Sequence, residues 1–192
     1  TFLGPAPTIT PDEITEEMLS KYQCIYIEGY LLVNEPLVRS TMEKAKKLGL
    51  KVALDLSNFN IVNAFKGMLE DIIPKYVDIL FSNESEAEAF TGQKAAEAVH
   101  TLSELVEVSL VTLGKEGALI GSHGQFYSVP AEGGKPVDTT GAGDNFAAGF
   151  LYGQSIGASL VQSARIGSML AGYVIDVVGP EIPYDKWEQI KL

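Results

Sequence analysis

The chain has 192 residues, of which 46% are hydrophobic, so it can bury one substantial core and a single domain over residues 1–192 is expected. Its net charge of −11 argues against nucleic acid or an anionic membrane as the main partner. The single Cys24 excludes an internal disulfide, and His100 and His123 lack ligand spacing. No apolar run approaches transmembrane length and no signal peptide is visible, so a cytoplasmic protein is expected.

The first half of the chain alternates predicted helices and strands. Thr10-Pro11-Asp12-Glu13 combines a capping residue, a proline and an acid, and the helix that it begins is expected to run to about Lys21. The further predicted elements are a strand at 24–27, a turn at 28–30, a helix at 34–48 stopped by Gly49, a strand at 51–56, a helix at about 64–73 broken at Pro74, and a strand at 77–81.

The second half continues with a short strand and then changes character. The predictions are a strand at 110–113, a hairpin of 118–120 and 125–129 around the turn 121–124, and helices at about 144–154 and 158–178. Strands that alternate with helices indicate βαβ units. The expected fold is therefore α/β, a doubly wound, mostly parallel sheet with helices on both faces.

The stretch Asp138-Thr-Thr-Gly-Ala-Gly-Asp144 carries the strongest chemical signal. Backbone amides at a loop-to-helix junction have no intrahelical acceptors, and glycines let an anion come close to them. An acid beside such an anion site makes sense if Asp144 accepts a proton from a hydroxyl that attacks a phosphate. The alternative is a glycine-rich turn in which Asp144 only stabilises the start of the helix.

This stretch, continued through Ala148-Gly149-Phe150, resembles the C-terminal signature of the ribokinase-like (PfkB) carbohydrate and nucleoside kinases. The resemblance implies that Asp144 is the catalytic base and that the amides of Gly141, Ala142 and Gly143 form an anion hole. The chain begins Thr-Phe-Leu-Gly and resembles the C-terminal two-thirds of such an enzyme. The N-terminal part and most of the lid, which supply most acceptor-binding residues, are therefore expected to be absent.

A second matching segment, residues 83–92, follows a predicted strand. It resembles the family's Asn-x-x-Glu motif, which implies that Asn83 lies near the phosphates of ATP and that Glu86 orders waters around Mg²⁺. Ligands of doubly wound sheets bind beyond the carboxyl ends of strands, and this segment lies at such an end. Ordinary capping by Asn83 is the alternative, and both roles can coexist.

A third segment, Thr112-Leu-Gly-Lys-Glu-Gly117, resembles the family's loop that contacts the nucleotide. Thr112 offers a hydroxyl, Gly114 and Gly117 permit close approach of the backbone, and Lys115 could reach a phosphate. A β-turn with a solvated lysine is the alternative.

The last long helix and the segment after it are implied to close over the adenine. The alignment places Ser168 where many members have Asn, which makes Ser168 a nucleotide-binding candidate and leaves a direct contact to the base open. Asp138, Thr140 through its carbonyl, and Gly179 are candidates for a monovalent cation site, with K⁺ as the ion. An Asx turn at Asp138 is the alternative.

Two further features have no assigned role. Asp55 and Asn58 end a strand at the same sheet edge, and Asp55 lies among apolar residues, which is unusual unless it is paired or functional. The stretch Tyr26-Ile-Glu-Gly-Tyr-Leu-Leu32 resembles adenosine-kinase-like members of the family.

The expected function is an ATP- and Mg²⁺-dependent kinase that phosphorylates a hydroxyl of a sugar or nucleoside. A dinucleotide-dependent oxidoreductase would need Gly-x-Gly-x-x-Gly after a strand, and a P-loop kinase would need Gly-x-x-x-x-Gly-Lys-Ser/Thr; neither pattern is present. A catalytically silent nucleotide-binding protein on the same fold stays open. So do the identity of the acceptor and a homodimer, which lid strands form in some members.

Overall fold

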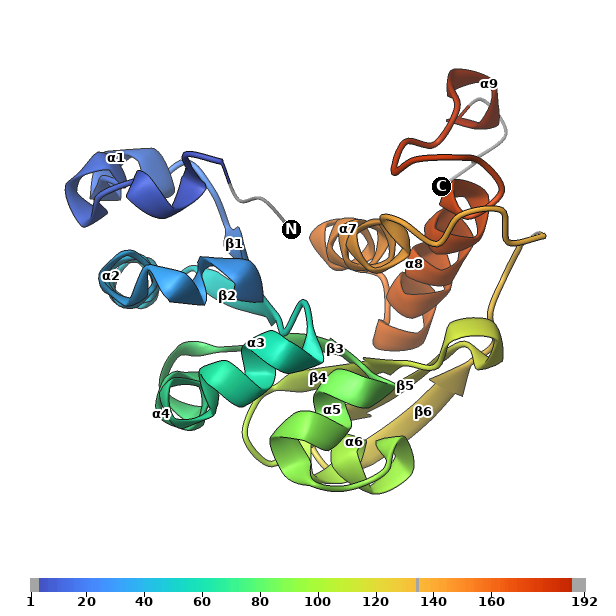
Figure 1. Cartoon of the computed structure of the whole chain (residues 1–192), viewed down its shortest axis with the longest axis horizontal. Helices are drawn as coiled ribbons and strands as arrows, with labels where there is room; N and C mark the ends of the chain where they lie inside the picture. The colour runs from blue at the N-terminus through green and yellow to red at the C-terminus, as the bar shows by residue number, and fades with distance from the viewer. Residues whose placement is uncertain (1–3, 134, 188–192) are drawn as a thin grey trace. The chain divides into compact units, whose positions relative to one another are not determined.

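A computed structural model describes residues 4–133 and 135–187 (Figure 1). In this part of the chain a sheet has six strands in the order β1-β2-β3-β4-β5-β6. The strands are β1 Cys24–Glu28, β2 Lys51–Asp55, β3 Ile79–Asn83, β4 Val108–Thr112, β5 Ala118–Ser122 and β6 Gln125–Val129. The helices are α1 Glu16–Leu19, α2 Glu35–Lys47, α3 Phe59–Ala64, α4 Lys66–Tyr76, α5 Glu84–Thr91, α6 Ala95–Ser103, α7 Ala142–Ser155, α8 Leu160–Val174 and α9 Tyr184–Trp187.

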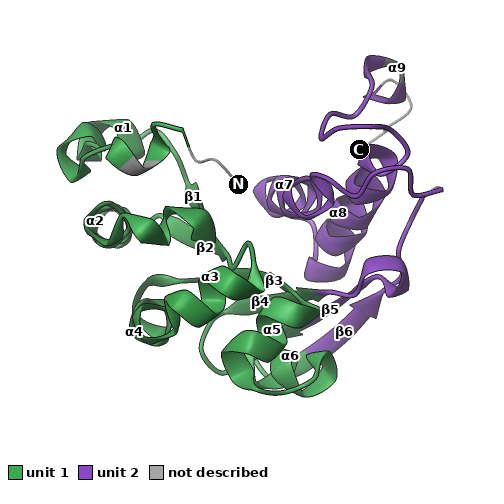
Figure 2. Ribbon diagram, viewed as in Figure 1, with its two compact units in different colours: residues 1–111, 121–125 green, residues 112–120, 126–192 purple. Residues whose placement is uncertain are grey.

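The chain divides into two compact units (Figure 2). Unit 1 comprises residues 1–111 and 121–125, and unit 2 comprises residues 112–120 and 126–192. The sequence did not predict this division, and the single domain over residues 1–192 stays a prediction. None of the helices in the described ranges is long and apolar enough to span a bilayer.

Unit 1 is built from parallel βαβ connections. β1 pairs with β2, and β2 with β3, all parallel, with Ile27 opposite Leu54 and Leu54 opposite Leu80. These strands are apolar because helices cover them, and Leu54 and Leu80 are fully buried. The parallel α/β arrangement predicted from the sequence is confirmed here.

Several element boundaries were predicted correctly because their signals are local. The Asn34 side chain accepts a hydrogen bond from the amide of Leu37 and begins α2, and Gly49 follows that helix with a φ of 78°. His123 and Gly124, with φ of 48° and 74°, form the two-residue turn between β5 and β6. The predicted hairpin is confirmed.

Other predictions were wrong. The helix expected from Thr10 to Lys21 is a 3-10 turn, Pro11–Glu13, followed by the separate α1, because Ile14 and Thr15 are extended and Thr15 caps a new helix. The helix predicted at about 64–73 is α4, which continues through Pro74 to Tyr76, and α3 before it was not predicted. Pro74 lies inside the last turn of α4, where its missing N–H removes only one hydrogen bond.

The starts of two strands and the end of the last long helix also differ from prediction. β3 begins two residues later than expected, and β4 begins two residues earlier. Helices α6 and α9 were not predicted. α8 ends at Val174 rather than near Val178, where the chain turns back to contact the loop before α7.

Unit 2 packs its two long helices backbone to backbone. α7 and α8 lie side by side (Figure 1). A Cβ on Gly149 would lie 2.8 Å from the Cα of Gly167, and a Cβ on Gly167 would lie 2.5 Å from the carbonyl oxygen of Phe146. The small residues that follow Asp144 in the sequence therefore bring α7 close to α8, which positions the loop that precedes α7.

Candidate active site

The Gly141-Ala142-Gly143-Asp144 motif lies at the start of α7, as the sequence predicted. Gly141 is the residue before the helix and has a φ of 79°, a left-handed conformation that favours glycine. A Cβ there would lie 2.8 Å from the Cβ of Pro180. Since both conformation and space require glycine, the turn into α7 depends on Gly141.

Not all of the predicted anion-hole amides are equally available. The amide of Ala142 donates to the carbonyl of Thr139 at 3.2 Å. The amides of Gly141 and Gly143 have no acceptor among the described residues, and no atom lies within 4 Å of a Cβ built on Gly143. Two unpaired N–H groups at a helix N-terminus can receive an anion.

Asp144 lies in the first turn of α7 and is exposed. Its carboxylate makes no hydrogen bond or ion pair with the residues that the structure describes. A carboxylate without such partners is free to accept a proton from a bound hydroxyl. The first turn of α7 therefore presents amide donors and a carboxylate acceptor side by side in sequence.

Asp138 is the most connected side chain of the motif. One carboxylate oxygen accepts from the Thr140 amide at 2.9 Å and from the Thr140 hydroxyl at 2.7 Å, and the other accepts from the Gly179 amide at 3.0 Å. These donors hold the pKa of Asp138 below its ordinary value, with the Gly179 amide as the largest cause. The structure brings together Asp138, Thr140 and Gly179, the three candidates for the cation site. Hydrogen bonds already join Asp138 to the other two.

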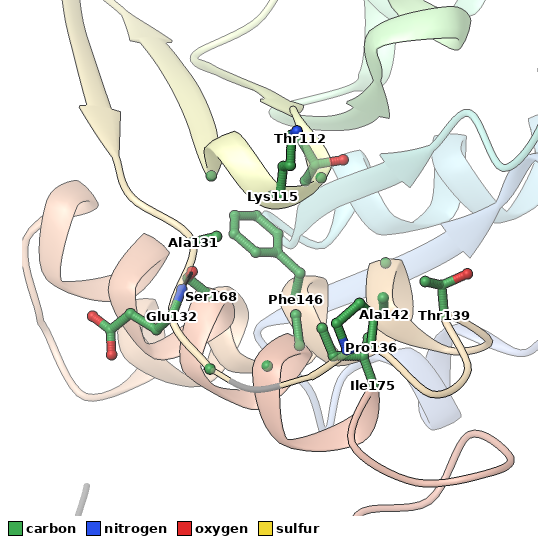
Figure 3. A pocket seen from close by; sticks show the side chains of 16 residues that line it. Thr112, Lys115, Ala131, Glu132, Pro136, Thr139, Ala142, Phe146, Ser168 and Ile175 are labelled. Atoms are coloured by element: carbon green, nitrogen blue, oxygen red, sulfur yellow. Dashed lines mark hydrogen bonds between the residues drawn. The ribbon is translucent and has the colours of Figure 1, made fainter.

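Unit 2 contains a cavity of about 430 Å³, within the range of small-molecule sites (Figure 3). It collects seven of the residues predicted for the site, which are Thr112, Gly114, Lys115, Gly117, Ala142, Gly143 and Ser168. Gly141, Asp144, Asp138 and Gly179 do not line it. Residues 112–117, 142–143 and 168 thus share one cavity, which the local motifs alone did not establish.

The turn between β4 and β5 supplies part of the cavity wall. Gly114 and Gly117 have φ of 54° and 98°, and the carbonyl of Gly117 accepts from the amide of Leu113 at 2.8 Å. A Cβ on Gly117 would lie 1.9 Å from the carbonyl oxygen of Val129. The turn predicted as the alternative is present, and Thr112 and Lys115 also line the cavity; contact of this loop with a nucleotide stays a prediction.

Ser168 lies on α8 and is buried. Its hydroxyl donates to the carbonyl of Pro130 at 2.9 Å and accepts from the amide of Glu132 at 2.9 Å. The residue lines the cavity, but its hydrogen-bonding groups are directed to the protein backbone.

Other cavity residues were not identified from the sequence. They are Ala131, Glu132, Gly133, Pro136, Thr139, Phe146, Ala171, Gly172 and Ile175. Most carry no reactive group, so no chemical signal could have found them. Asn145 was also missed: its side-chain amide donates to the carbonyl of Gly141 at 2.9 Å and to that of Pro180 at 3.4 Å, which links α7 to the segment after α8.

The Asn83–Glu86 motif lies in unit 1, between β3 and α5. The Asn83 side chain accepts from the Glu86 amide at 3.0 Å, and the two Glu86 oxygens accept from the Asn83 amide at 2.8 Å and from its side chain at 2.6 Å. This is a complete capping box, so the capping alternative is observed. Burial is the largest cause that raises the pKa of Glu86, the carboxylate of Asp55 adds to it, and the Asn83 donors oppose both, so that the pKa is raised to about 7.

The end of β2 places Asp55 in a polar network, also in unit 1. Asp55 accepts from the Tyr26 hydroxyl at 3.2 Å and from the Ser57 amide at 2.6 Å. Ser57 has a φ of 62°, unusual for a residue other than glycine, and its hydroxyl accepts from the Gly29 amide at 2.7 Å. Asn58 caps α3. Asp55 is therefore paired, as its apolar sequence context suggested, and Ser57 is a strained residue that the sequence did not reveal.

Among the described residues, no group of three or more histidine, cysteine or acidic side chains could hold a metal ion. Glu86 is only 4% exposed and both of its oxygens already accept hydrogen bonds, so direct coordination would have to displace them. A role for Glu86 toward Mg²⁺ fits only through water.

Residues 2–187 match the family model of the pfkB family carbohydrate kinases, and the chain belongs to that family. The ribokinase-like resemblance predicted from the motifs is confirmed. Adenosine kinase of Saccharomyces cerevisiae is 32% identical over 97% of this chain and 59% of its own length.

Solved structures agree with this assignment. The adenosine kinase from Sinorhizobium meliloti superposes with a TM-score of 0.89 at 29% identity, over 95% of this chain and 59% of that one. The Arabidopsis thaliana ribokinase complexed with ribose and ATP superposes with a TM-score of 0.76 at 25% identity, over 96% and 60%. The α/β ribokinase-like fold is thus confirmed, and the chain spans less than two-thirds of the length of these relatives.

Proposed function

We propose that this protein transfers the γ-phosphoryl group of ATP to a hydroxyl of a sugar or nucleoside. The observation that carries the proposal is the start of α7, where the amides of Gly141 and Gly143 and the carboxylate of Asp144 have no hydrogen-bond partner within the described part of the chain. Phosphoryl transfer requires mainly positioning and charge stabilisation, and this arrangement offers both.

Each group has a distinct role in the proposed reaction. Asp144 takes the proton of the acceptor hydroxyl as the new P–O bond forms. The amides of Gly141 and Gly143 donate to the charge that develops on the transferred group, and Ala142 joins them if its amide leaves Thr139. The helix N-terminus adds favourable partial charge.

The cavity is proposed to hold the nucleotide. Gly143 lies at its phosphate end, Lys115 and Thr112 can approach the phosphates, and the small apolar residues around Ala171 can accommodate the base. Mg²⁺ would arrive with the nucleotide and neutralise phosphate charge. A water-mediated role for Glu86 toward Mg²⁺ stays a prediction from the sequence. A K⁺ site near Asp138 is also part of the proposal, although the carboxylate oxygens of Asp138 already accept hydrogen bonds from N–H and O–H donors.

The acceptor to test first is adenosine, because relatives named adenosine kinase match most of this chain at 29–32% identity. The experiment is an ATP-consumption screen of the full-length natural chain against adenosine, inosine, ribose and fructose. Asp144→Asn is expected to lower turnover by roughly 10²–10⁴-fold, the range of a general base, with ATP affinity nearly unchanged.

The same screen tests the alternative of a silent nucleotide-binding protein. Binding of ATP without consumption of ATP for any acceptor would favour that alternative. Turnover of Asp144→Asn within threefold of wild type would remove Asp144 from the mechanism, whichever acceptor is used.

A further inference from the structure

A short backbone segment, residues 130–133, is fastened to α8 by one serine. Ser168 is 6% exposed, and its hydroxyl bonds both the carbonyl of Pro130 and the amide of Glu132 at 2.9 Å. We call residues 130–133 the strap. A single hydroxyl thus satisfies two backbone groups of the strap, 38 and 36 residues away in sequence.

Two glycines let the strap lie directly on the helix backbone. A Cβ on Gly172 would lie 1.9 Å from the carbonyl oxygen of Glu132, and a Cβ on Gly133 would lie 2.5 Å from the Cα of Gly172. Gly133 also has a φ of 112°, a backbone conformation that residues with a side chain rarely adopt. The strap can therefore occupy this position only while both residues lack side chains.

The strap forms a wall of the cavity in unit 2. Ala131, Glu132 and Gly133 line the cavity together with Ala171 and Gly172 of α8. In Figure 3 the Glu132 carboxylate extends away from Phe146, so this wall presents mainly backbone and small apolar groups. Such a surface suits a flat, uncharged group such as a nucleobase.

The Ser168 hydroxyl has little capacity left for a ligand. A serine hydroxyl has one hydrogen to donate, and Pro130 receives it. One of its two lone pairs accepts from the Glu132 amide. A base that needs a hydrogen-bond donor cannot obtain one from Ser168 unless the strap is released.

We infer that Ser168 is a positioning residue for the nucleobase, acting through the strap that it holds against α8 rather than through contact with the base. The inference rests on the proposed binding of a nucleotide in this cavity. Loss of the hydroxyl leaves two strap groups unpaired and lets the wall move, which weakens binding of the base. The chemistry at the start of α7 is left unchanged.

The test compares two buried serines of α8 in the full-length natural chain. Ser168→Ala removes both strap bonds. Ser163→Ala is the matched control, because Ser163 is fully buried and accepts from the side chain of Gln154 at 2.7 Å without lining the cavity. ATP affinity is measured by calorimetry, KM and kcat by ATP consumption, and strap mobility by hydrogen exchange at the Glu132 amide.

Ser168→Ala is expected to raise the Kd and KM for ATP by about fivefold or more, the effect of losing one or two net hydrogen bonds, with kcat within twofold. Exchange at the Glu132 amide should accelerate. Ser163→Ala should leave the Kd within twofold of wild type. An unchanged Kd in Ser168→Ala, or an equal rise in Ser163→Ala, overturns the inference.

A second variant keeps the test decisive if Ser168→Ala does not fold. Ala131→Gly loosens the exposed strap without touching Ser168 and is expected to raise the Kd about threefold through added backbone freedom. An unchanged Kd would contradict the inference. If the wild type itself neither binds nor consumes ATP, the proposed function fails instead, which separates the two outcomes.

Discussion

The carboxylate of Asp138 accepts a hydrogen bond from the backbone amide of Gly179 at 3.0 Å, across 41 residues of sequence. The amides of Val137 and Asp138 also donate to the carbonyl of Ile175, at 2.7 and 3.3 Å. The loop that enters α7 is therefore tied to the segment that leaves α8. These ties hold Gly141 and Gly143, the glycines of the proposed anion hole, in place.

Replacing Asp138 with Ala is expected to lower turnover by roughly 10- to 100-fold, because small displacements of catalytic groups reduce rates by such factors. ATP affinity should change less than threefold, since Asp138 does not line the cavity. Steady-state kinetics and calorimetry measure the two effects. Asp176→Ala is the control, as its carboxylate has no hydrogen bond or ion pair among the described residues. Equal turnover in both variants would show that the tie does not matter.

Gly143→Ala should separate stability from activity. Nothing lies within 4 Å of a Cβ at Gly143, so the change is expected to leave the free energy of unfolding equal or raise it by up to about 1 kcal/mol. Turnover should fall at least tenfold, because the methyl group would occupy space that the proposed phosphate needs. Denaturant unfolding and ATP consumption test this.

The matched control for that variant is Gly67→Ala. Gly67 is also the second residue of a helix and also has open space around a built Cβ. A similar gain in stability with unchanged turnover is expected. Equal activity losses in both variants would contradict an anion hole at Gly143.

The raised pKa of Glu86 predicts that the stability of the protein depends on pH. Its pKa is about 7 in the folded protein against an ordinary 4.5, so the folded state binds more protons than the unfolded state between these values. The free energy of unfolding therefore falls as pH rises through this window and levels off above pH 7. Between pH 5 and pH 8 the wild type should lose about 1–3 kcal/mol more than Glu86→Gln. The free energy of unfolding is measured with urea at each pH. If it changed with pH equally in the two proteins, the raised pKa would be contradicted.

Substitution of the buried Asp78, which does not line the cavity, is expected to lower the stability of the protein. Its buried carboxylate accepts from the Lys46 ammonium at 2.8 and 2.9 Å and from the Val52 amide at 2.8 Å. Asp78→Ala should lower the free energy of unfolding by about 2–4 kcal/mol, because it leaves a buried amide and an ammonium without their acceptor. Thermal or urea unfolding measures this.

Glu107→Ala is the control for Asp78. Glu107 pairs with Lys51 at 2.6 Å, but both side chains are about half exposed, at 49% and 50%. Exposed ion pairs contribute little, so a loss below about 1 kcal/mol is expected. A similar loss in both variants would show that burial of Asp78 has no special effect.

Signals within a few residues predicted the structure well. The Asn83–Glu86 capping box, the glycine after α2 and the hairpin turn at His123-Gly124 all depend on neighbours in the chain. The same reasoning failed where two local signals competed. Thr10 and Thr15 each cap a separate turn or helix, and the sequence did not show that the chain is extended at Ile14 and Thr15.

The sequence by itself determined the family, the parallel α/β units and the residues that could perform phosphoryl transfer, because turns, caps and the Gly-Ala-Gly-Asp motif are short-range features. Only the tertiary structure decided that the amide of Ala142 is partly engaged, that Asp138 bonds Gly179, and that the Ser168 hydroxyl holds the strap. The Asp138–Gly179 bond and the bonds between Ser168 and the strap join atoms that are far apart in sequence, and their approach depends on how unit 2 packs. That packing is set by glycine contacts between helices, which no local pattern specifies.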